Sequence, residues 1–435
     1  MNRKRQKKAA PKPSKWNRLD NAAKIFPPTS NKRDTKVFRF ACELKSPVEP
    51  RLLQQALDET MIRFPYYSSI LKKGLFWYYL EETDLKPVVK EENMPPSSPI
   101  YDKNIRRLLF EVTYFKNRIN LEIYHSLSDG TGALRFLQVL VYRYLLLRFP
   151  EGMKDVPPFT YDASMTQKAD DSFQKYYQKN KKHIKEKSRN AYHIRGAKVP
   201  DNRNQLIEAV VPVREVVTKA HEYGATLTTF LIAALMCSVA DIMTLREKKK
   251  PVVVTVPVNL RKYFPSVSAR NFFSVFEVQY DFKNQSPAFK DVVLYVTDYF
   301  KRELTAERMG IRMNKLAALE HNLAARVVPR PIKDFCLWVA NWFSNKKITA
   351  AFSNIGVVDM PEEMQTYIRM FDVFVNTGRL QVCMCSYGEN LTMTFTSAFE
   401  STEVQKNFFR ILTGMGISAT IITPPTEENR GEEKE

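Results

Sequence analysis

The string His-Ser-Leu-Ser-Asp-Gly at residues 125–130 constrains this chain more than any other segment, because it lies where a strand pattern ends and a helix pattern begins. In residues 118–125 the apolar side chains occupy the odd positions, the period of a half-buried strand. Residues 133–149 carry apolar side chains at spacings of three and four, which predicts an amphipathic helix. His125 and Asp129 are therefore expected at a strand-to-helix junction, where an imidazole can perform acid–base chemistry.

Each residue of this HxxxDG motif also has a structural interpretation. A histidine on an apolar face is usually a core residue, and an aspartate just before a helix is by default an N-cap that accepts a backbone N–H. Gly130 either lets the backbone come close to a reacting carbonyl or is an ordinary loop glycine. The rest of the chain has to decide between these interpretations.

A second segment supplies a partner for Asp129. The apolar run at residues 252–258 predicts a buried strand, and Arg261 follows it with a permanent charge that needs a carboxylate if it is to stay inside. We expect Asp129 to be that carboxylate. The ion pair would then hold the loop that carries His125 in shape.

The order of these pieces resembles the chloramphenicol acetyltransferase-like superfamily. Besides the motif and its arginine, the resemblance rests on the apolar run at 224–235, on Asn271 and on the Ser-Asn-x-Gly string at 353–356. It extends over residues 16–422. Within the superfamily the chain looks most like the alcohol O-acetyltransferase branch, which is related to the condensation domains of peptide synthetases.

The resemblance implies both a fold and a reaction. The implied fold is α/β, with two chloramphenicol acetyltransferase-like lobes of mixed β-sheets flanked by helices and an active-site tunnel between them. The implied reaction moves an acyl group, acetyl in the simplest case, from coenzyme A to a small alcohol or amine acceptor, with His125 as the general base. An imidazole with a pKa of about 6.5 is mostly neutral at cytoplasmic pH and can both remove and return a proton. Acyl-CoA, most simply acetyl-CoA, is then a cosubstrate and no cofactor is expected to stay bound.

Two further groups of residues are candidates for this site. An acyl-transfer intermediate needs hydrogen-bond donors for its oxyanion, and we look for them at Ser353 and Asn354, whose alternative role is to shape a turn. A channel wall is predicted on the segment after Arg270, although aromatic side chains fill cores first. Its candidates are Asn271, Phe272, Phe273 and Phe276.

The chain departs from its relatives at two places. Condensation domains usually carry two consecutive histidines, and Tyr124 stands in the first place here, which counts against peptide-bond synthesis. The Asp-Phe-Gly-Trp-Gly string of many superfamily members is absent from the sequence. Two alternatives stay open: a carrier-protein-dependent condensation or N-acylation enzyme, and a non-catalytic basic protein that binds lipid or nucleic acid.

Charge narrows the list of partners. The chain has a net charge of +20 over 435 residues, with 44% hydrophobic and 26% charged residues, which is an ordinary globular composition with a basic surplus. That surplus suits acyl-CoA, an acidic acyl carrier protein or an anionic membrane surface, or it is simply a solvated face. Nucleic acid is disfavoured because the sequence has no zinc finger, RNP-type aromatic motif or basic helix with heptads.

Five segments are expected along the chain. They are a disordered basic tail at 1–15, an N-terminal acyltransferase lobe at 16–161 that carries the motif, a connector at 162–204 with a polar helix at 172–188, a C-terminal acyltransferase lobe at 205–425, and an acidic tail at 426–435. Within the second lobe we expect one long helix at 288–319 and a hairpin between strands 371–376 and 381–387.

Neither a metal site nor a membrane span is expected. The five cysteines form no CxxC pair and are interpreted as reduced thiols. The basic N-terminus has no apolar core typical of a signal peptide, and no uninterrupted apolar run reaches the roughly 18 residues of a transmembrane helix. We expect a cytoplasmic protein.

Overall fold

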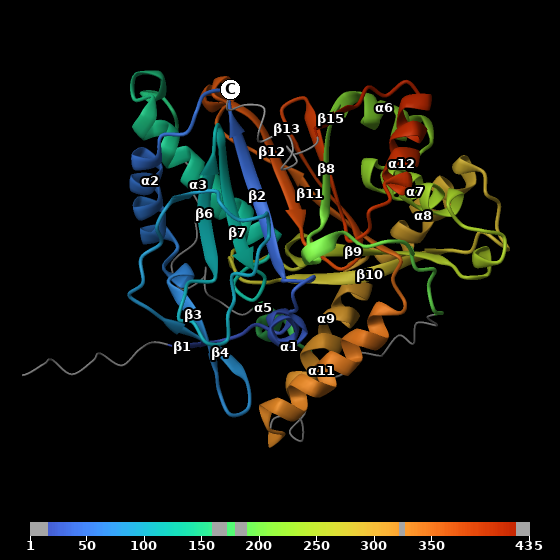
Figure 1. The fold of residues 1–435 in the computed structure, drawn as a ribbon, viewed down its shortest axis with the longest axis horizontal. Helices are drawn as coiled ribbons and strands as arrows, with labels where there is room; N and C mark the ends of the chain where they lie inside the picture. The colour runs from blue at the N-terminus through green and yellow to red at the C-terminus, as the bar shows by residue number, and fades with distance from the viewer. Residues whose placement is uncertain (1–15, 159–171, 179–188, 322–326, 423–435) are drawn as a thin grey trace, which may run out of the picture.

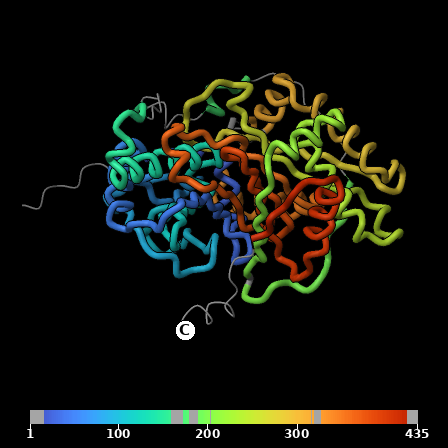
Figure 2. The backbone as a smooth tube through the Cα atoms, turned by 90° about the horizontal axis from the view of Figure 1, so that it is seen from above, coloured from blue at the N-terminus to red at the C-terminus, as the bar shows by residue number. Residues whose placement is uncertain are grey.

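The computed structural model describes residues 16–158, 172–178, 189–321 and 327–422. In this part of the chain, mixed β-sheets are flanked by helices, so the expected α/β class is confirmed (Figure 1). The buried hydrophobic residues form two large core clusters, one for each of the two larger sheets. Seen from above, the blue-to-teal half of the chain lies beside the green-to-red half, and an orange-red stretch crosses between them (Figure 2).

The first sheet has five strands and carries the motif. Helices α2 (Pro50–Arg63) and α3 (Gly130–Arg148) lie along one face of it (Figure 1). Twelve residues of α3 are buried, because its apolar stripe is broad. In spatial order the strands are β12 (Ile368–Val375), β2 (Val37–Leu44), β7 (Arg118–Tyr124), β6 (Phe110–Phe115) and β5 (Lys90–Glu91).

The second sheet has seven strands and belongs to the C-terminal half. In spatial order they are β10 (Phe273–Tyr280), β9 (Val252–Asn259), β11 (Ala350–Val357), β13 (Leu380–Tyr387), β14 (Asn390–Ser397), β8 (Gln205–Pro212) and β15 (Thr420–Ile422). The helices of this half that are drawn beside the sheet in Figure 1 are α6 (Val213–Glu222), α7 (Leu227–Asp241), α8 (Phe289–Glu303) and α12 (Glu403–Gly414). Helix α7 is almost wholly buried and begins with a Thr226–Thr229 capping box.

The remaining elements lie at one end of the molecule. A small antiparallel sheet contains β1 (Trp16–Arg18), β4 (Tyr78–Glu82) and β3 (Ser69–Lys73). The helices are α1 (Phe26–Thr29), α5 (Ser172–Tyr176), α9 (Ala306–His321) and α11 (Arg330–Asn345). Helix α11 packs against α1 and exposes several aromatic side chains to solvent, among them Trp338 and Trp342.

Strand β12 corrects the hairpin that the sequence predicts. It pairs antiparallel with β2 in the first sheet, whereas β13 lies in the second sheet between β11 and β14. The chain therefore crosses from one sheet to the other between Val375 and Leu380 instead of turning back on itself. Turn residues at 376–378 mark a change of direction but do not specify the partner strand, which tertiary packing decides.

The predicted helix at 288–319 is also interrupted. Helix α8 ends at Glu303 and α9 begins at Ala306, and Thr305 accepts a hydrogen bond on Oγ1 from Arg308 N at 3.3 Å. A threonine that caps a new helix competes with continuation of the old one. Of the polar helix predicted at 172–188, α5 is the described portion, and residues 179–188 lie outside the described residues, as do both tails.

A buried ion-pair network joins the two larger sheets. Arg118 on β7 donates two hydrogen bonds to Glu208 on β8, at 3.0 and 2.6 Å, and a third to Glu43 on β2 at 2.8 Å. Burial raises the pKa of Glu208 to about 7, and the charge of Asp372 on β12 adds to the effect. Bidentate pairing of this kind fixes orientation as well as distance, so the network positions one sheet against the other.

Candidate active site

His125 follows directly on strand β7, in an aromatic cage. The Phe26 ring stacks on the imidazole at 4.5 Å between centroids, and Phe38 and Phe273 lie at 4.7 and 5.7 Å. The backbone N–H of His125 donates to the carbonyl oxygen of Lys36 at 2.8 Å. Lys36 itself has a φ of 58°, a left-handed conformation that costs free energy in a residue with a side chain and is frequent at functional sites.

Asn271 fixes which ring nitrogen of His125 carries the proton. Its amide NH2 group donates to the His125 carbonyl oxygen at 3.0 Å and to Asp20 Oδ2 at 3.4 Å, so its Oδ1 must face the ring, where it lies 3.2 Å from Nδ1. An amide oxygen only accepts hydrogen bonds, and therefore Nδ1 carries the hydrogen and Nε2 keeps its lone pair. Asp20 also accepts from the Asn271 backbone N–H at 3.2 Å. Both supporting residues are fully buried.

Burial lowers the pKa of His125 below its usual value. The carboxylate of Asp129 and the hydrogen bond with Asn271 raise this pKa in part, and the charge of Lys36 lowers it again. The imidazole is consequently neutral near pH 7. A neutral ring with a free Nε2 is the form that a general base requires.

The expected ion pair between Asp129 and Arg261 is present. Arg261 Nη1 donates to Asp129 Oδ2 at 2.7 Å, and the two side chains are only 6% and 5% exposed. Asp129 Oδ2 also accepts from Phe272 N at 2.8 Å, and its Oδ1 caps helix α3 by accepting from Gly132 N at 2.9 Å. The cap interpretation and the ion-pair interpretation therefore both hold, and this carboxylate ties the motif to the strand that follows Asn271.

Gly132, and not Gly130, is the glycine that the backbone requires. A Cβ at Gly132 would lie 2.2 Å from Ala269 O and 2.3 Å from Ser128 Oγ, which itself donates to Ala269 O at 2.6 Å. A Cβ at Gly130 would lie 3.0 Å from the terminal methyl of Ile355 and 3.9 Å from Cζ of Phe40, with no backbone atom that close. Gly130 therefore lies close to Ile355 of β11. The position that cannot hold a larger side chain is Gly132.

The oxyanion candidates lie on β11 near the motif. Asn354 is exposed, its Nδ2 donates to Thr228 Oγ1 at 2.8 Å, and its Oδ1 accepts from Gly356 N at 2.8 Å, so it shapes the bulge between Asn354 and Gly356. Ser353 is half-buried one residue earlier. Ile355, which touches Gly130, brings this end of the strand beside the loop of His125.

The four channel candidates have different surroundings. Asn271 holds the imidazole, and Phe273 lies against it. Phe272 and Phe276 are 0% and 2% exposed within the second core, where they contact Phe173 and Phe300 respectively. Core packing, which takes aromatic side chains first, explains these two positions better than a channel wall does.

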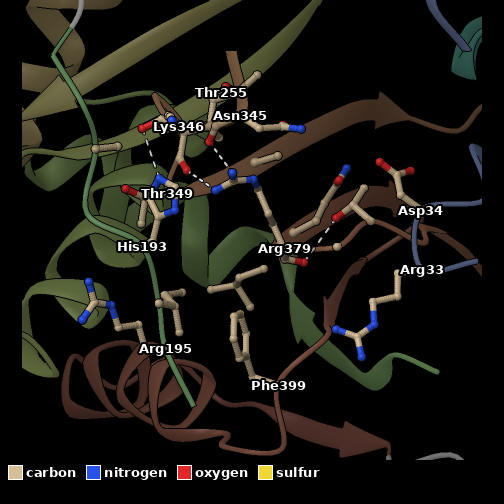
Figure 3. Close-up of a pocket in the computed structure, with 18 of the residues that line it drawn as sticks. Arg33, Asp34, His193, Arg195, Thr255, Asn345, Lys346, Thr349, Arg379 and Phe399 are labelled. Carbon is tan, nitrogen blue, oxygen red and sulfur yellow. Dashed lines mark hydrogen bonds between the residues drawn. The ribbon is translucent and has the colours of Figure 1, made fainter. Parts of the chain in front are cut away.

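A large basic pocket lies beside this cluster. Its volume is about 980 Å³, and its lining includes Lys36. Arg379, His193 and Thr255 also line it (Figure 3). The pocket draws on the segment before β2, the segment before β8, and the beginnings of β11 and β13. Sequence analysis missed this pocket because its residues are scattered along the chain, and it missed the role of Asp20 because nothing local marks that carboxylate.

Other kinds of site find no support among the described residues. No group of three or more His, Cys, Asp or Glu side chains in that part of the chain could hold a metal ion. The five cysteines are free thiols. No single described helix has the length and hydropathy to cross a bilayer; α6 and α7 meet that test only together, as a pair bent by 82°.

Comparison with known proteins defines the class of fold. No protein-family model and no curated protein sequence matches the chain. Solved structures do match, and they show that this chain shares its fold with acetyltransferases and condensation domains, which is the fold that the resemblance implies.

Three of these structures illustrate the range of that class. TRI101 of Fusarium sporotrichioides, complexed with coenzyme A and T-2, matches with a TM-score of 0.60 at 11% identity, over 94% of this chain and all of its own. The first condensation domain of the calcium-dependent antibiotic synthetase, in complex with a substrate analogue, matches with 0.60 at 12% identity, over 92% of this chain and 95% of its own. Polyketide synthase associated protein 5 from Mycobacterium tuberculosis matches with 0.58 at 12% identity, over 91% of this chain and 96% of its own.

Proposed function

We propose that this protein is an acyltransferase that moves an acyl group, acetyl in the simplest case, from a coenzyme A thioester to an alcohol acceptor. The observation that carries the proposal is the hydrogen bond from His125 Nδ1–H to Asn271 Oδ1, since it leaves Nε2 as the basic atom. An acid–base histidine that is neutral, oriented and only partly buried suits a reaction in which a hydroxyl loses its proton.

The chemistry follows from that atom. Nε2 of His125 accepts the proton of the acceptor hydroxyl while the hydroxyl oxygen forms a bond to the thioester carbonyl carbon. Collapse of the tetrahedral intermediate breaks the carbon–sulfur bond, and the imidazolium gives its proton to the departing thiolate. The products are an ester and the free thiol of coenzyme A. Asp129 and Arg261 act as positioning residues, because their contacts are to the motif backbone and to each other.

Similar structures support a thioester donor. One is the trichothecene 15-O-acetyltransferase TRI3, and TRI101 was crystallised with coenzyme A and T-2. The starter condensation domain of rhizomide synthetase was crystallised with C8-CoA and an amino-acid thioester. Tyr124 argues against the condensation variant here, because its side chain is fully buried and its hydroxyl lies 2.9 Å from Ser30 Oγ.

Product identification tests this proposal. Full-length protein is incubated with acetyl-CoA or octanoyl-CoA and with a panel of alcohols and amines, and mass spectrometry identifies the acylated product while a thiol reagent follows coenzyme A release. The proposal predicts acceptor-dependent thiol release and an ester product. An amide, or transfer only from an acyl carrier protein, would instead establish the condensation variant. Release of thiol that is the same with and without every acceptor would overturn acyl transfer.

A further inference from the structure

The basic pocket is far richer in positive than in negative charge. Among its described lining residues, seven are Lys or Arg and one is acidic, Asp34. The cations come from five separate segments of the chain, so no single run of charge in the sequence produces them. They are Arg33, Lys36, Arg195, Lys198, Lys250, Lys346 and Arg379.

Three of these positive charges, those of Arg379, Lys250 and Arg195, act together on one neighbour, His193. Arg379 donates hydrogen bonds to the backbone carbonyl oxygens of Ile348 and Asn345, neither of which carries a charge. Lys346 lies over the Trp342 ring at 3.4 Å. His193 donates from Nε2 to the Lys346 carbonyl oxygen at 3.1 Å. Burial lowers the pKa of His193, and the charges of Arg379, Lys250 and Arg195 lower it further, which reflects the positive potential of the pocket. The only acid of the lining, Asp34, is already engaged by Lys36. Like charges gathered in one hollow attract an anion.

A polar group without a partner faces the same cavity. The Oγ1 atom of Thr255 on β9 is buried and has no hydrogen-bond partner in the described structure. Thr255 lines the cavity together with Arg379 and His193 (Figure 3). A buried hydroxyl usually finds a partner, and the Thr255 hydroxyl is one of the exceptions.

The pocket opens on one side of the His125 loop. Lys36, which lines it, binds the backbone N–H of His125 through its carbonyl oxygen. Strand β11 lines the pocket at Ala351, near its first residue. Four residues later Ile355 lies beside Gly130 of the motif, so the strand rises about 13 Å between the two places. Asn354 and Thr228 lie at that far end. A reaction between two molecules at His125 needs two approaches, and the pocket supplies one of them.

We propose that this pocket binds the acceptor through a phosphate or carboxylate group, and that the substrate is an anionic alcohol. This inference rests on the proposed function, because only an acyl-transfer reaction has an acceptor. The acceptor's negative group lies among Arg379, Lys250 and Arg195, and its hydroxyl reaches towards Nε2 of His125. The thioester donor comes from the side of Asn354. A volume of about 980 Å³ is at the upper end of the range for small-molecule sites.

The test uses two charge-neutralised variants of the full-length protein. The pocket variant is Arg195→Gln with Lys250→Gln, both exposed side chains of the lining. The matched control is Arg246→Gln with Lys249→Gln, which removes the same charge from exposed positions outside the lining. Turnover is measured with glycerol 3-phosphate against glycerol and with 3-hydroxybutyrate against 1,3-butanediol.

We expect the charged member of at least one pair to be preferred by the wild-type protein and by the control. In the pocket variant the KM for the charged acceptor should rise about tenfold or more with kcat little changed. The KM for the neutral acceptor should stay the same. The proposal is overturned if neutral and charged acceptors are used equally. It is also overturned if the pocket variant loses affinity for coenzyme A in calorimetry and keeps its acceptor KM, because the pocket then holds the donor's phosphates.

Binding of inorganic phosphate separates this inference from the proposed function. Calorimetry with phosphate needs no turnover, so it can be read even if no acceptor is acylated. Phosphate should bind wild-type protein and the control variant equally, and the pocket variant about tenfold more weakly. Equal phosphate affinity of all three proteins would contradict an anion site here, whatever the reaction is.

Discussion

Replacing Asp129 by alanine should be among the most destabilising substitutions in the protein. The change removes the acceptor for three donors at once: Arg261 Nη1 at 2.7 Å, Phe272 N at 2.8 Å and Gly132 N at 2.9 Å. Arg261 would keep its bonds to the Ser268 and Arg270 carbonyl oxygens but would lose its counter-charge while only 6% exposed.

The expected cost follows from this burial. Removing one partner of a buried ion pair typically costs about 3–5 kcal/mol, because the other charge stays inside without compensation. Each buried backbone N–H left without an acceptor adds to that penalty. We therefore expect a loss of about 4 kcal/mol in the free energy of unfolding. Asp129→Asn should cost less than alanine but still be destabilising, since all three contacts are donors and the amide NH2 must face one of them.

Chemical denaturation followed by circular dichroism measures these differences. The series is wild type, Asp129→Ala, Arg261→Met and the double variant. The double variant should be more stable than the sum of the single losses predicts, with a coupling of about 2 kcal/mol. A loss below about 1 kcal/mol for Asp129→Ala, or strictly additive losses, would refute the view that this pair holds the motif.

Other predictions concern glycines, a buried acid and the partner of the imidazole. Gly132→Ala should lower the free energy of unfolding by about 2 kcal/mol or more, because its Cβ would meet backbone and a buried hydroxyl. Gly130→Ala should lower it by less than about 1 kcal/mol, because its Cβ would meet neither. Equal effects of the two substitutions would contradict the steric argument. The pKa of Glu208, raised to about 7 from 4.5, means that the folded protein holds a proton that the unfolded chain has released. The stability from this group is therefore complete below about pH 4.5 and lost as the pH rises through about 7. Relative to Glu208→Gln, the wild-type protein should lose stability between about pH 5 and pH 8, and a flat difference would contradict the raised pKa. Asn271→Ala should lower kcat about ten- to a hundredfold with the KM for acyl-CoA unchanged, because the histidine loses its orienting partner; an effect on KM alone would assign Asn271 to binding.

The sequence allowed the motif and its ion pair to be predicted because both follow from local patterns. The strand before His125 and the helix after it show their periods directly, and a charged arginine after an apolar strand requires a buried carboxylate. The hydrogen bond between Asn271 and His125 joins residues 146 positions apart, and no local pattern predicts its geometry. The sequence predicted Asn271 as part of a channel wall. Asn271 does lie at the site, but it orients the imidazole of His125.

Strand β12 shows why the predicted hairpin is wrong. Strand β12 has the alternation of any half-buried strand, and its partner β2 lies more than three hundred residues earlier in the chain. Local turn residues favoured a hairpin with β13, and packing in the first core prevailed. The same crossing brings Arg379 to the pocket. A site whose charges come from five separate segments leaves no signature in any one of them.

The rate of thiol release by His125→Ala is the most direct test of the account. The matched control is His221→Ala, because His221 is an exposed histidine on α6. The assay uses folded variants, saturating acyl-CoA and an alcohol that the wild-type protein accepts. We expect thiol release by His125→Ala to be about a hundred- to ten-thousandfold slower than by wild type, and thiol release by His221→Ala to be unchanged. The wild-type rate should fall in acid with an apparent pKa below about 6.5, since burial lowers the pKa of His125. A His125→Ala variant that turns over within about threefold of wild type would contradict the assignment of this imidazole as the base.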